Sequence, residues 1–313
     1  MKWPITSSSN NCSTKKLQEG EAQLKIQSVV SRNVALPFFQ GEKWLVYTGL
    51  LGFLLAGLCA YWVMLYGGPV APYGDVSKAF SFNAALGIFL LSTAAILPFS
   101  GLGTKRKAFL RWSYIALSLF AYVAETMQNF RGMNPRFVKD GTPFDVAIGS
   151  IFTVVALLFI LYYVFIAIAF FRKQAYSLQP KLVLGIRYAM IAVMLSFAAG
   201  IWISIEGIIG KHGSMMWLHG LGFHALQVVP FVAWLSEQKR HVTAARHRFI
   251  HLTGITYLLG LVAIGWQTYL GRAVLEMSIF PILAACCFLI AFIPVVVLLL
   301  NKTEIRHTSE IQN

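Results

Sequence analysis

Two stretches of the chain contain no charged residue: VVALLFILYYVFIAIAF (residues 154–170) and ILAACCFLIAFIPVVVLLL (residues 282–300). A run of about 20 apolar residues is what an α-helix needs to cross the hydrocarbon of a bilayer. Inside that layer every backbone amide must be paired within the protein, and an α-helix pairs its own. Both stretches are therefore predicted to be transmembrane helices.

Six further segments have a comparable length and an apolar character. Together with the first two, they predict helices at 44–66, 80–99, 108–128, 146–171, 187–209, 215–236, 249–271 and 274–300. The predicted fold class is all-α, a polytopic transmembrane bundle of about eight helices over residues 44–300. A polar, disordered cytoplasmic tail is expected at 1–43, and a second cytoplasmic tail at 301–313.

The composition excludes an ordinary soluble protein. Hydrophobic residues make up 57% of the 313 residues and charged residues only 12%. Soluble domains carry about 25% charged residues, so lipid must be the solvent for most of this chain. The four cysteines lack C-x-x-C spacing, which gives no indication of a disulfide framework or a thiolate zinc site.

The basic residues fall mainly on one side of such a bundle. With eight crossings, twenty of the 26 Lys and Arg residues lie in one set of tails and connectors, and six lie in the other. The twelve acidic residues divide equally, so one side carries the whole net charge of +14. Because Lys and Arg accumulate in short cytoplasmic connectors, both termini are predicted to be cytoplasmic.

The same distribution argues against nucleic-acid binding. Basic residues that bind nucleic acid cluster on a polar domain or arm, whereas here they sit in short connectors between apolar segments. The expected partner is the lipid bilayer. No repeat relates the two halves of the chain, so the usual sequence indication of a secondary transporter is missing.

Ionisable and polar groups gather at the predicted outer ends of the helices. Ionisable groups within a membrane are costly, and each is therefore a candidate functional residue. Glu125 and Gln128 share one stripe in the last turns of the helix at 108–128, and Arg131 continues it. Glu206 ends the helix at 187–209, and Arg272 follows the helix at 249–271.

The helix at 215–236 carries the deepest candidates. His219, His224 and Gln227 fall within one arc of its surface. At about 1.5 Å per residue, His224 lies roughly 14 Å below the outer end of this helix, near the middle of the membrane. His224 is the strongest single candidate, because it is the deepest of these groups and a position near the headgroups cannot explain its presence.

Several interpretations of these groups remain open. His and Gln often only hydrogen-bond a neighbouring helix, and Glu or Arg near a helix end can reach the headgroups. A bis-His haem lacks a second imidazole at the depth of His224. A metal could take His219, His224 and Glu206, although the i, i+5 spacing differs from that of a helical zinc motif. Alternatively, Arg131 or Arg272 could hold an anionic group. His224 and Glu206 would then exchange protons.

Two short motifs also carry a resemblance. Residues 128–132 read QNFRG, followed by TPF at 142–144, and residues 219–230 read HGLGFHALQVVP. They are similar to the Q-x-x-R-G and H-x-x-G-x-H-A-x-Q-x-x-P motifs of a family of uncharacterised bacterial multi-pass membrane proteins. Arg136 stands where that family has a histidine. The resemblance implies a bacterial cell membrane and a shared site without naming a reaction; its residues would be Gln128, Arg131, His219, His224 and Gln227.

Three functions are compatible with these observations. The first is a plasma-membrane protein with an outward-facing polar site that binds a small molecule or a lipid headgroup, for transport or sensing. The second is a membrane-embedded enzyme, or a redox or metal protein, acting at the outer leaflet. The third is a structural bundle that assembles with partners. The sequence assigns no cofactor, and it leaves open whether the chain forms an oligomer.

Overall fold

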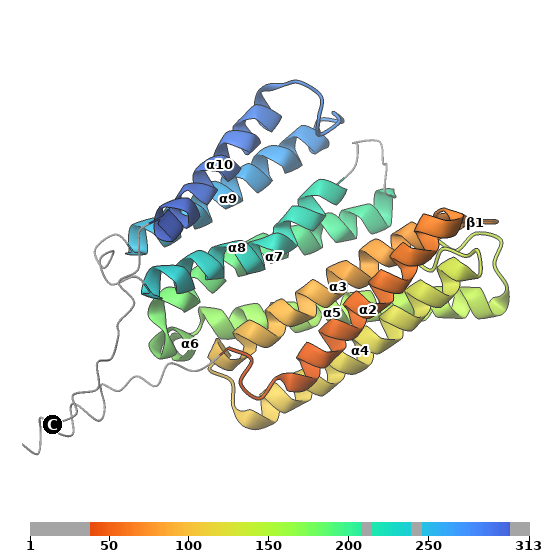
Figure 1. Ribbon diagram of the computed structural model, residues 1–313, viewed down its shortest axis with the longest axis horizontal. Helices are drawn as coiled ribbons and strands as arrows, with labels where there is room; N and C mark the ends of the chain where they lie inside the picture. Colours follow the sequence, from red (N-terminus) through yellow and green to blue (C-terminus); the bar gives the residue numbers. More distant parts are fainter. Residues whose placement is uncertain (1–37, 208–214, 239–245, 301–313) are drawn as a thin grey trace, which may run out of the picture. The chain divides into compact units, whose positions relative to one another are not determined.

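The computed structural model describes residues 38–207, 215–238 and 246–300 (Figure 1). The predicted tails lie outside these ranges, except for residues 38–43. The α-helices of the described part are α2 (Lys43–Tyr66), α3 (Val76–Ile96), α4 (Thr104–Phe130), α5 (Pro143–Phe171), α6 (Lys173–Leu178), α7 (Pro180–Glu206), α8 (Met216–Gln238), α9 (Arg246–Tyr269) and α10 (Ile279–Leu300). A hairpin pairs β1 (Pro69–Val70) with β2 (Gly74–Asp75), and a 3₁₀ helix, η1, covers Leu97–Ser100.

Seven helices of the described part are long and apolar enough to cross a membrane: α2, α3 together with η1, α5, α7, α8, α9 and α10. The remaining long helix, α4, has 27 residues, but its hydropathy is lowered by the basic residues in its first turns. It starts just after η1, and its far end lies against the hairpin that precedes α3, where the Tyr73 amide donates to the Gly132 carbonyl at 2.7 Å. It therefore spans the same thickness as α3. The predicted all-α polytopic bundle is confirmed, with α4 as the least apolar crossing.

Large apolar side chains cover the outside of the helices. Met64, Leu161 and Leu289 are 84, 63 and 71% exposed, and many other aliphatic and aromatic side chains are exposed in the same way. A surface of this kind is unfavourable in water and favourable against acyl chains. The chain is therefore a multi-pass membrane protein in contact with the lipid bilayer.

Small residues bring neighbouring helices into close contact. A Cβ built on Gly49 of α2 would lie 3.0 Å from the Gly87 carbonyl oxygen, and a Cβ on Gly87 of α3 would lie 2.9 Å from that of Gly49. Lipid tails are as apolar as leucine, so packing of this kind drives the association of helices within a membrane. The absence of side chains at these two positions lets α2 and α3 pack backbone against backbone.

Some helix starts differ from the predicted ones for local reasons. α3 begins before residue 80, because the Asp75 carboxylate accepts a hydrogen bond from the Ser77 amide at 3.0 Å and caps the helix. α7 begins at Pro180, before residue 187, since proline suits a first helical turn. α10 begins only at Ile279, after residue 274, because the Gln267 side chain donates to two carbonyls of the preceding loop.

An aromatic cluster links four helices of the bundle. Phe89 of α3 stacks on Tyr163 of α5, with ring centroids 4.4 Å apart. Phe223 of α8 meets Phe89 at 4.8 Å and Phe197 of α7 at 5.1 Å. Edge-to-face and stacked pairs at these separations add to the stability gained from packing alone. This cluster positions α8, which carries the predicted histidines, against α3.

Single cysteines can test which side of the membrane each end faces. Lys139, between α4 and α5, and Lys105, at the start of α4, are both exposed. In a background without the native cysteines, we expect Lys139→Cys to react with an impermeant maleimide on intact cells. Lys105→Cys should react only after permeabilisation, because the basic ends are predicted to be cytoplasmic. The opposite labelling pattern would invert the topology.

Candidate functional site

A buried ion pair lies at the C-terminal end of α4. Glu125 is only 1% exposed, and both of its carboxylate oxygens accept hydrogen bonds from Arg136. Arg136 Nε donates to Oε2 at 3.1 Å, and Nη2 donates to Oε1. Asn129 Nδ2 also donates to Oε1, at 3.3 Å. Because a two-pronged contact of this kind fixes orientation as well as charge, the pair ties the loop after α4 to the side of that helix.

A second buried acid, Asp145, lies in the first turn of α5. Its Oδ2 accepts hydrogen bonds from the Thr142 amide at 3.0 Å and the Thr142 hydroxyl at 2.7 Å, which forms a capping box. Its Oδ1 accepts from Gln128 Nε2 at 3.0 Å and from Arg131 Nη1 at 2.9 Å. Arg131 Nη1 donates to Gln128 Oε1 as well, at 2.7 Å. Asp145 therefore joins α5 to α4 and holds Arg131 in position.

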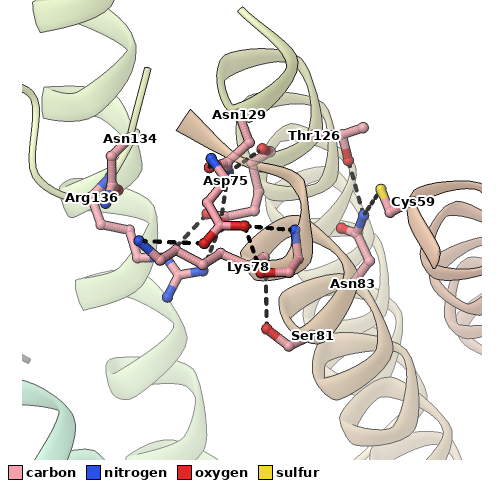
Figure 2. Close-up of polar contacts among 11 residues, drawn as sticks. Cys59, Asp75, Lys78, Ser81, Asn83, Thr126, Asn129, Asn134 and Arg136 are labelled. Atoms are coloured by element: carbon pink, nitrogen blue, oxygen red, sulfur yellow. Dashed lines mark hydrogen bonds and ion pairs between the residues drawn. The ribbon is translucent and has the colours of Figure 1, made fainter. Parts of the chain in front are cut away.

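A tight turn after α4 brings these groups together. Gly132 has a φ of +79°, and a Cβ built on it would lie 1.9 Å from the Ala71 carbonyl oxygen in the hairpin. Glycine is suited to both requirements, since it has no Cβ and adopts positive φ readily. The hairpin is also held by the Asp75 amide, which donates to Asn129 Oδ1 at 3.0 Å (Figure 2). The strand pair thus covers the end of α4.

A smaller polar contact joins α2, α3 and α4 deeper in the bundle. Asn83 of α3 donates through Nδ2 to the Thr126 hydroxyl at 2.9 Å, and the same nitrogen lies 3.9 Å from Cys59 Sγ (Figure 2). Asn83 is fully buried. Polar contacts between membrane helices average about 0.6 kcal/mol. This group contributes to helix packing, and its hydrogen bonds to described residues involve neither carboxylate.

His219 packs against α7. Its Nδ1 donates to the Ser196 carbonyl at 2.7 Å, and the Ser196 hydroxyl donates to the His219 carbonyl. A Cβ on Gly200 would lie 2.7 Å from the His219 ring, so the absence of a side chain at Gly200 makes room for the imidazole. Because a carbonyl can only accept, Nδ1 carries a hydrogen and Nε2 is the nitrogen left for other contacts.

His224 belongs to a second polar chain, which reaches α3. His224 Nδ1 donates to Gln227 Oε1 at 3.1 Å, Gln227 Nε2 donates to the Ser92 hydroxyl at 2.6 Å, and that hydroxyl donates to the Ile88 carbonyl at 2.7 Å. The His224 side chain is exposed on the surface of the bundle. This series of hydrogen bonds places a hydrogen on Nδ1 of His224. Nε2 is then the ring nitrogen left for other contacts within the membrane.

Glu206 and Arg272 lie at other helix ends. Glu206 is exposed at the last residue of α7. Arg272 is half-exposed in the loop after α9, where its Nε lies 3.9 Å from a carboxylate oxygen of Glu276. Exposed pairs of this kind contribute about 0–1 kcal/mol. Neither residue touches the carboxylates of α4 and α5 in the described part of the chain.

The structure groups the predicted residues into separate sets. Gln128 and Arg131 meet at Asp145, whereas Glu125 bonds Arg136 and Asn129. His224 and Gln227 bond one another, and His219 has its own partner on α7. Over the described ranges, no group of three or more His, Cys, Asp or Glu side chains is placed to hold a metal ion. The geometry therefore gives no support to a shared metal on His219, His224 and Glu206.

Asp145 and Arg136, which bond the predicted residues at the end of α4, were absent from the predicted site. Asp145 belongs to the sequence TPFD, in which a threonine three residues before an acid just ahead of an apolar run is typical of a capped helix start. That pattern indicates the cap but not the bond to Arg131. The sequence spacing did not indicate that Arg136 would bond Glu125, because the two meet only when the loop after α4 folds back on the helix.

The loop beyond the cluster has one perturbed group. The Tyr73 hydroxyl donates to Asp140 Oδ2 at 2.6 Å, and this hydrogen bond raises the pKa of Tyr73 above its ordinary value. Ionising the tyrosine would place two negative charges in contact, so the neutral form is favoured. The contact ties the hairpin to the α4–α5 loop at neutral pH.

Comparison of the chain with protein-family models, curated proteins and solved structures gives no match. The class of protein therefore follows from the fold and composition alone. An all-α bundle with apolar crossings and a lipid-facing surface defines a multi-pass membrane protein.

Proposed function

We propose that this protein sits in the plasma membrane of a bacterial cell and binds an anionic small molecule or lipid headgroup at its outer surface, for transport or sensing. Arg131 would hold the anionic group. The support for the membrane and its sides is the one-sided distribution of Lys and Arg. The support for the site is the way in which Arg131 is held.

Arg131 is fixed in place, yet most of its hydrogen-bonding capacity is unused. Its side chain is 41% exposed, and its hydrogen bonds to described residues use Nη1 alone. A guanidinium has five N–H donors in a rigid fork that suits carboxylate and phosphate groups. The guanidinium carbon of Arg131 lies 4.9 Å from the centre of the Phe144 ring, and this contact restricts the arginine side chain further. This is the observation that carries the proposal.

The buried acid beside Arg131 has hydrogen-bond donors other than that arginine. Asp145 already accepts three hydrogen bonds from Thr142 and Gln128. Arg136, in contrast, uses both Nε and Nη2 on Glu125. Arg136 is thus committed to the fold through two bonds to one acid, whereas Asp145, which orients Arg131, keeps three hydrogen bonds without it. An orienting shell of this kind is what binding sites require.

His224 would act as the proton-exchanging group of the same protein. Its open Nε2 lies at a depth where an ionisable side chain is costly, and Gln227 with Ser92 fixes its orientation. The similarity of residues 128–132 and 219–230 to the two family motifs supports a functional link between Arg131 and His224. That resemblance stays a prediction.

Thermal unfolding of the purified protein with soluble anions tests the proposal. Inorganic phosphate, succinate and glutamate are added singly to the wild type, to Arg131→Gln and to Arg272→Gln. We expect at least one anion to raise the melting temperature of the wild type and of Arg272→Gln but not of Arg131→Gln. Arg272 is a matched control, because it is a half-exposed arginine at another outer loop.

The proposal fails under either of two results. One is that none of the three anions stabilises the wild type. The other is that Arg131→Gln retains the full stabilisation. Without any anion, Arg131→Gln should lose less stability than Arg136→Gln, because Asp145 keeps three hydrogen bonds when the arginine is removed.

A further inference from the structure

A cavity of about 630 Å³ opens at the inner end of the bundle, away from the polar groups described above. It lies between the turn that joins η1 to α4 and the turn that joins α5 to α6. Its lining contains three basic side chains, Lys105, Arg106 and Arg172, together with the neutral polar residues Ser100, Thr104 and Gln174. Cavities of this size are typical of ligand sites, which span about 300–1,000 Å³.

Glycines shape the wall of this cavity. Gly101 has a φ of +68°, and a Cβ on it would lie 3.0 Å from the Ala175 amide nitrogen, so the two turns pack backbone against backbone. Gly103 caps α4 without a side chain, and a Cβ built there would meet nothing within 4 Å. Gly101 therefore lets the two turns pack closely, and Gly103 leaves the first turn of α4 uncovered.

The start of α4 is positive in two ways at once. Its first helical hydrogen bond runs from the Lys107 amide to the Gly103 carbonyl at 3.0 Å, so the amides of residues 104–106 point outward without a helical acceptor. The first turn contains no acidic residue and no side-chain cap. Cations beside the positive end of a helix dipole are unfavourable, and an anion bound there would relieve the repulsion.

No described acidic residue offsets this charge. None of the residues that line the cavity is acidic, and no ion pair within the described part involves Lys105, Arg106 or Arg172. The carbonyls that end α5 are also occupied. Arg187 donates through Nε to the Phe170 carbonyl at 2.9 Å and through Nη2 to the Arg172 carbonyl at 3.3 Å. The Arg172 side chain lines the cavity.

The surroundings of the cavity favour a lipid over a free anion. Phe109, one turn beyond Lys105, and Phe171, next to Arg172, are exposed by half or more of their surface, as is usual for aromatic residues at the membrane interface. Phe109 of α4 stacks on Tyr162 of α5, with centroids 6.4 Å apart, and closes the seam between the two helices. Ile168, half-exposed on α5 next to the lining residue Ala169, adds an apolar side chain to the lipid-facing surface of that helix.

We propose that this cavity binds the phosphate headgroup of an anionic phospholipid of the inner leaflet. Lys105, Arg106 and Arg172 would surround the phosphate, with the open amides of α4 beneath it, while the acyl chains lie along the seam of α4 and α5. Basic pockets between helices on the cytoplasmic side are the sites at which anionic lipid headgroups bind. The site is independent of Arg131, which lies at the opposite end of α4.

Lipid titration of the delipidated full-length protein tests this site, with binding followed by native mass spectrometry. The probes are phosphatidylglycerol, phosphatidylcholine and inorganic phosphate. We expect phosphatidylglycerol to bind more tightly than phosphatidylcholine. Removing basic side chains in Arg172→Gln and in Lys105→Gln/Arg106→Gln should weaken phosphatidylglycerol about fivefold for each charge lost. Arg248→Gln removes the same charge from the first turn of α9, outside the cavity, and should leave the affinity unchanged.

Three results would overturn the proposal. Equal affinities for phosphatidylglycerol and phosphatidylcholine would remove the role of the headgroup charge. Equal effects of Arg172→Gln and Arg248→Gln would place the lipid elsewhere. Phosphate binding that Arg172→Gln abolishes would make the ligand a free anion. Should Arg172→Gln unfold, the double variant on α4 gives the same test, because it alters exposed side chains on a different helix.

Discussion

Replacing Arg136 by Gln should destabilise the protein by about 3–5 kcal/mol, because it leaves the buried carboxylate of Glu125 without its counter-charge. Glu125 is 1% exposed and cannot turn toward water. Asn129 supplies one hydrogen bond at 3.3 Å, which does not replace a guanidinium. Unfolding of the purified variant in mixed detergent, followed by circular dichroism, measures the loss.

Replacing the acid of this pair should reduce the stability less than replacing the arginine. Glu125→Gln leaves Arg136, whose side chain is 30% exposed and can reach solvent. The double variant Glu125→Gln/Arg136→Gln should regain most of the stability lost in Arg136→Gln, since it buries no unpaired charge. If the double variant were as unstable as the sum of the single ones, the ion pair would not be the cause.

Gly132→Ala is expected to have the second large effect, a loss on the order of 3 kcal/mol or more. Two causes combine. A residue with a Cβ is strained at a φ of +79°, and the new carbon would lie 1.9 Å from the Ala71 carbonyl oxygen. That oxygen belongs to the backbone of the hairpin, so it can move only if the hairpin leaves α4. Thermal unfolding and loss of the Tyr73 contact, seen as a more accessible hairpin in proteolysis, measure the change.

Gly67→Ala separates the two causes. Gly67 has a φ of +85°, and a Cβ built on it meets nothing within 4 Å. Its replacement should therefore show the conformational strain alone, about 1–3 kcal/mol. A loss in Gly132→Ala no greater than that in Gly67→Ala would mean that the hairpin does not press on the turn.

The helices could largely be predicted from the sequence, because the need to pair every amide in lipid ties an apolar run to one structure. α2 and α5 follow their runs closely. The start of α10 could not be predicted from hydropathy, since Val274 and Leu275 are apolar but lie in a loop organised by the Gln267 side chain. Apolar composition indicates which residues tolerate lipid, but it does not show where a side chain ends a helix.

The candidate site could be predicted only in part. The helical spacing placed Glu125 and Gln128 on one stripe, but the structure gives them different partners. Glu125 bonds Arg136, and Gln128 bonds Asp145. The spacing could not show that Arg136 would be the partner of Glu125, because that contact depends on the path of a loop. It also could not show that His219 turns toward α7, since the room for its ring comes from Gly200 on another helix.

The outer ion pairs have a consequence for how the protein enters the membrane. Glu125, Arg131, Arg136 and Asp145 all belong to the stretch that runs from the end of α4 to the start of α5, and each acid bonds an arginine of that stretch. An isolated charge at the centre of a membrane helix costs about 2.5–3.5 kcal/mol during insertion by the translocon. A hairpin of α4 and α5 can neutralise these four charges internally before it moves across. The least apolar crossing of the protein thus brings its own counter-ions, and none of them comes from a later helix.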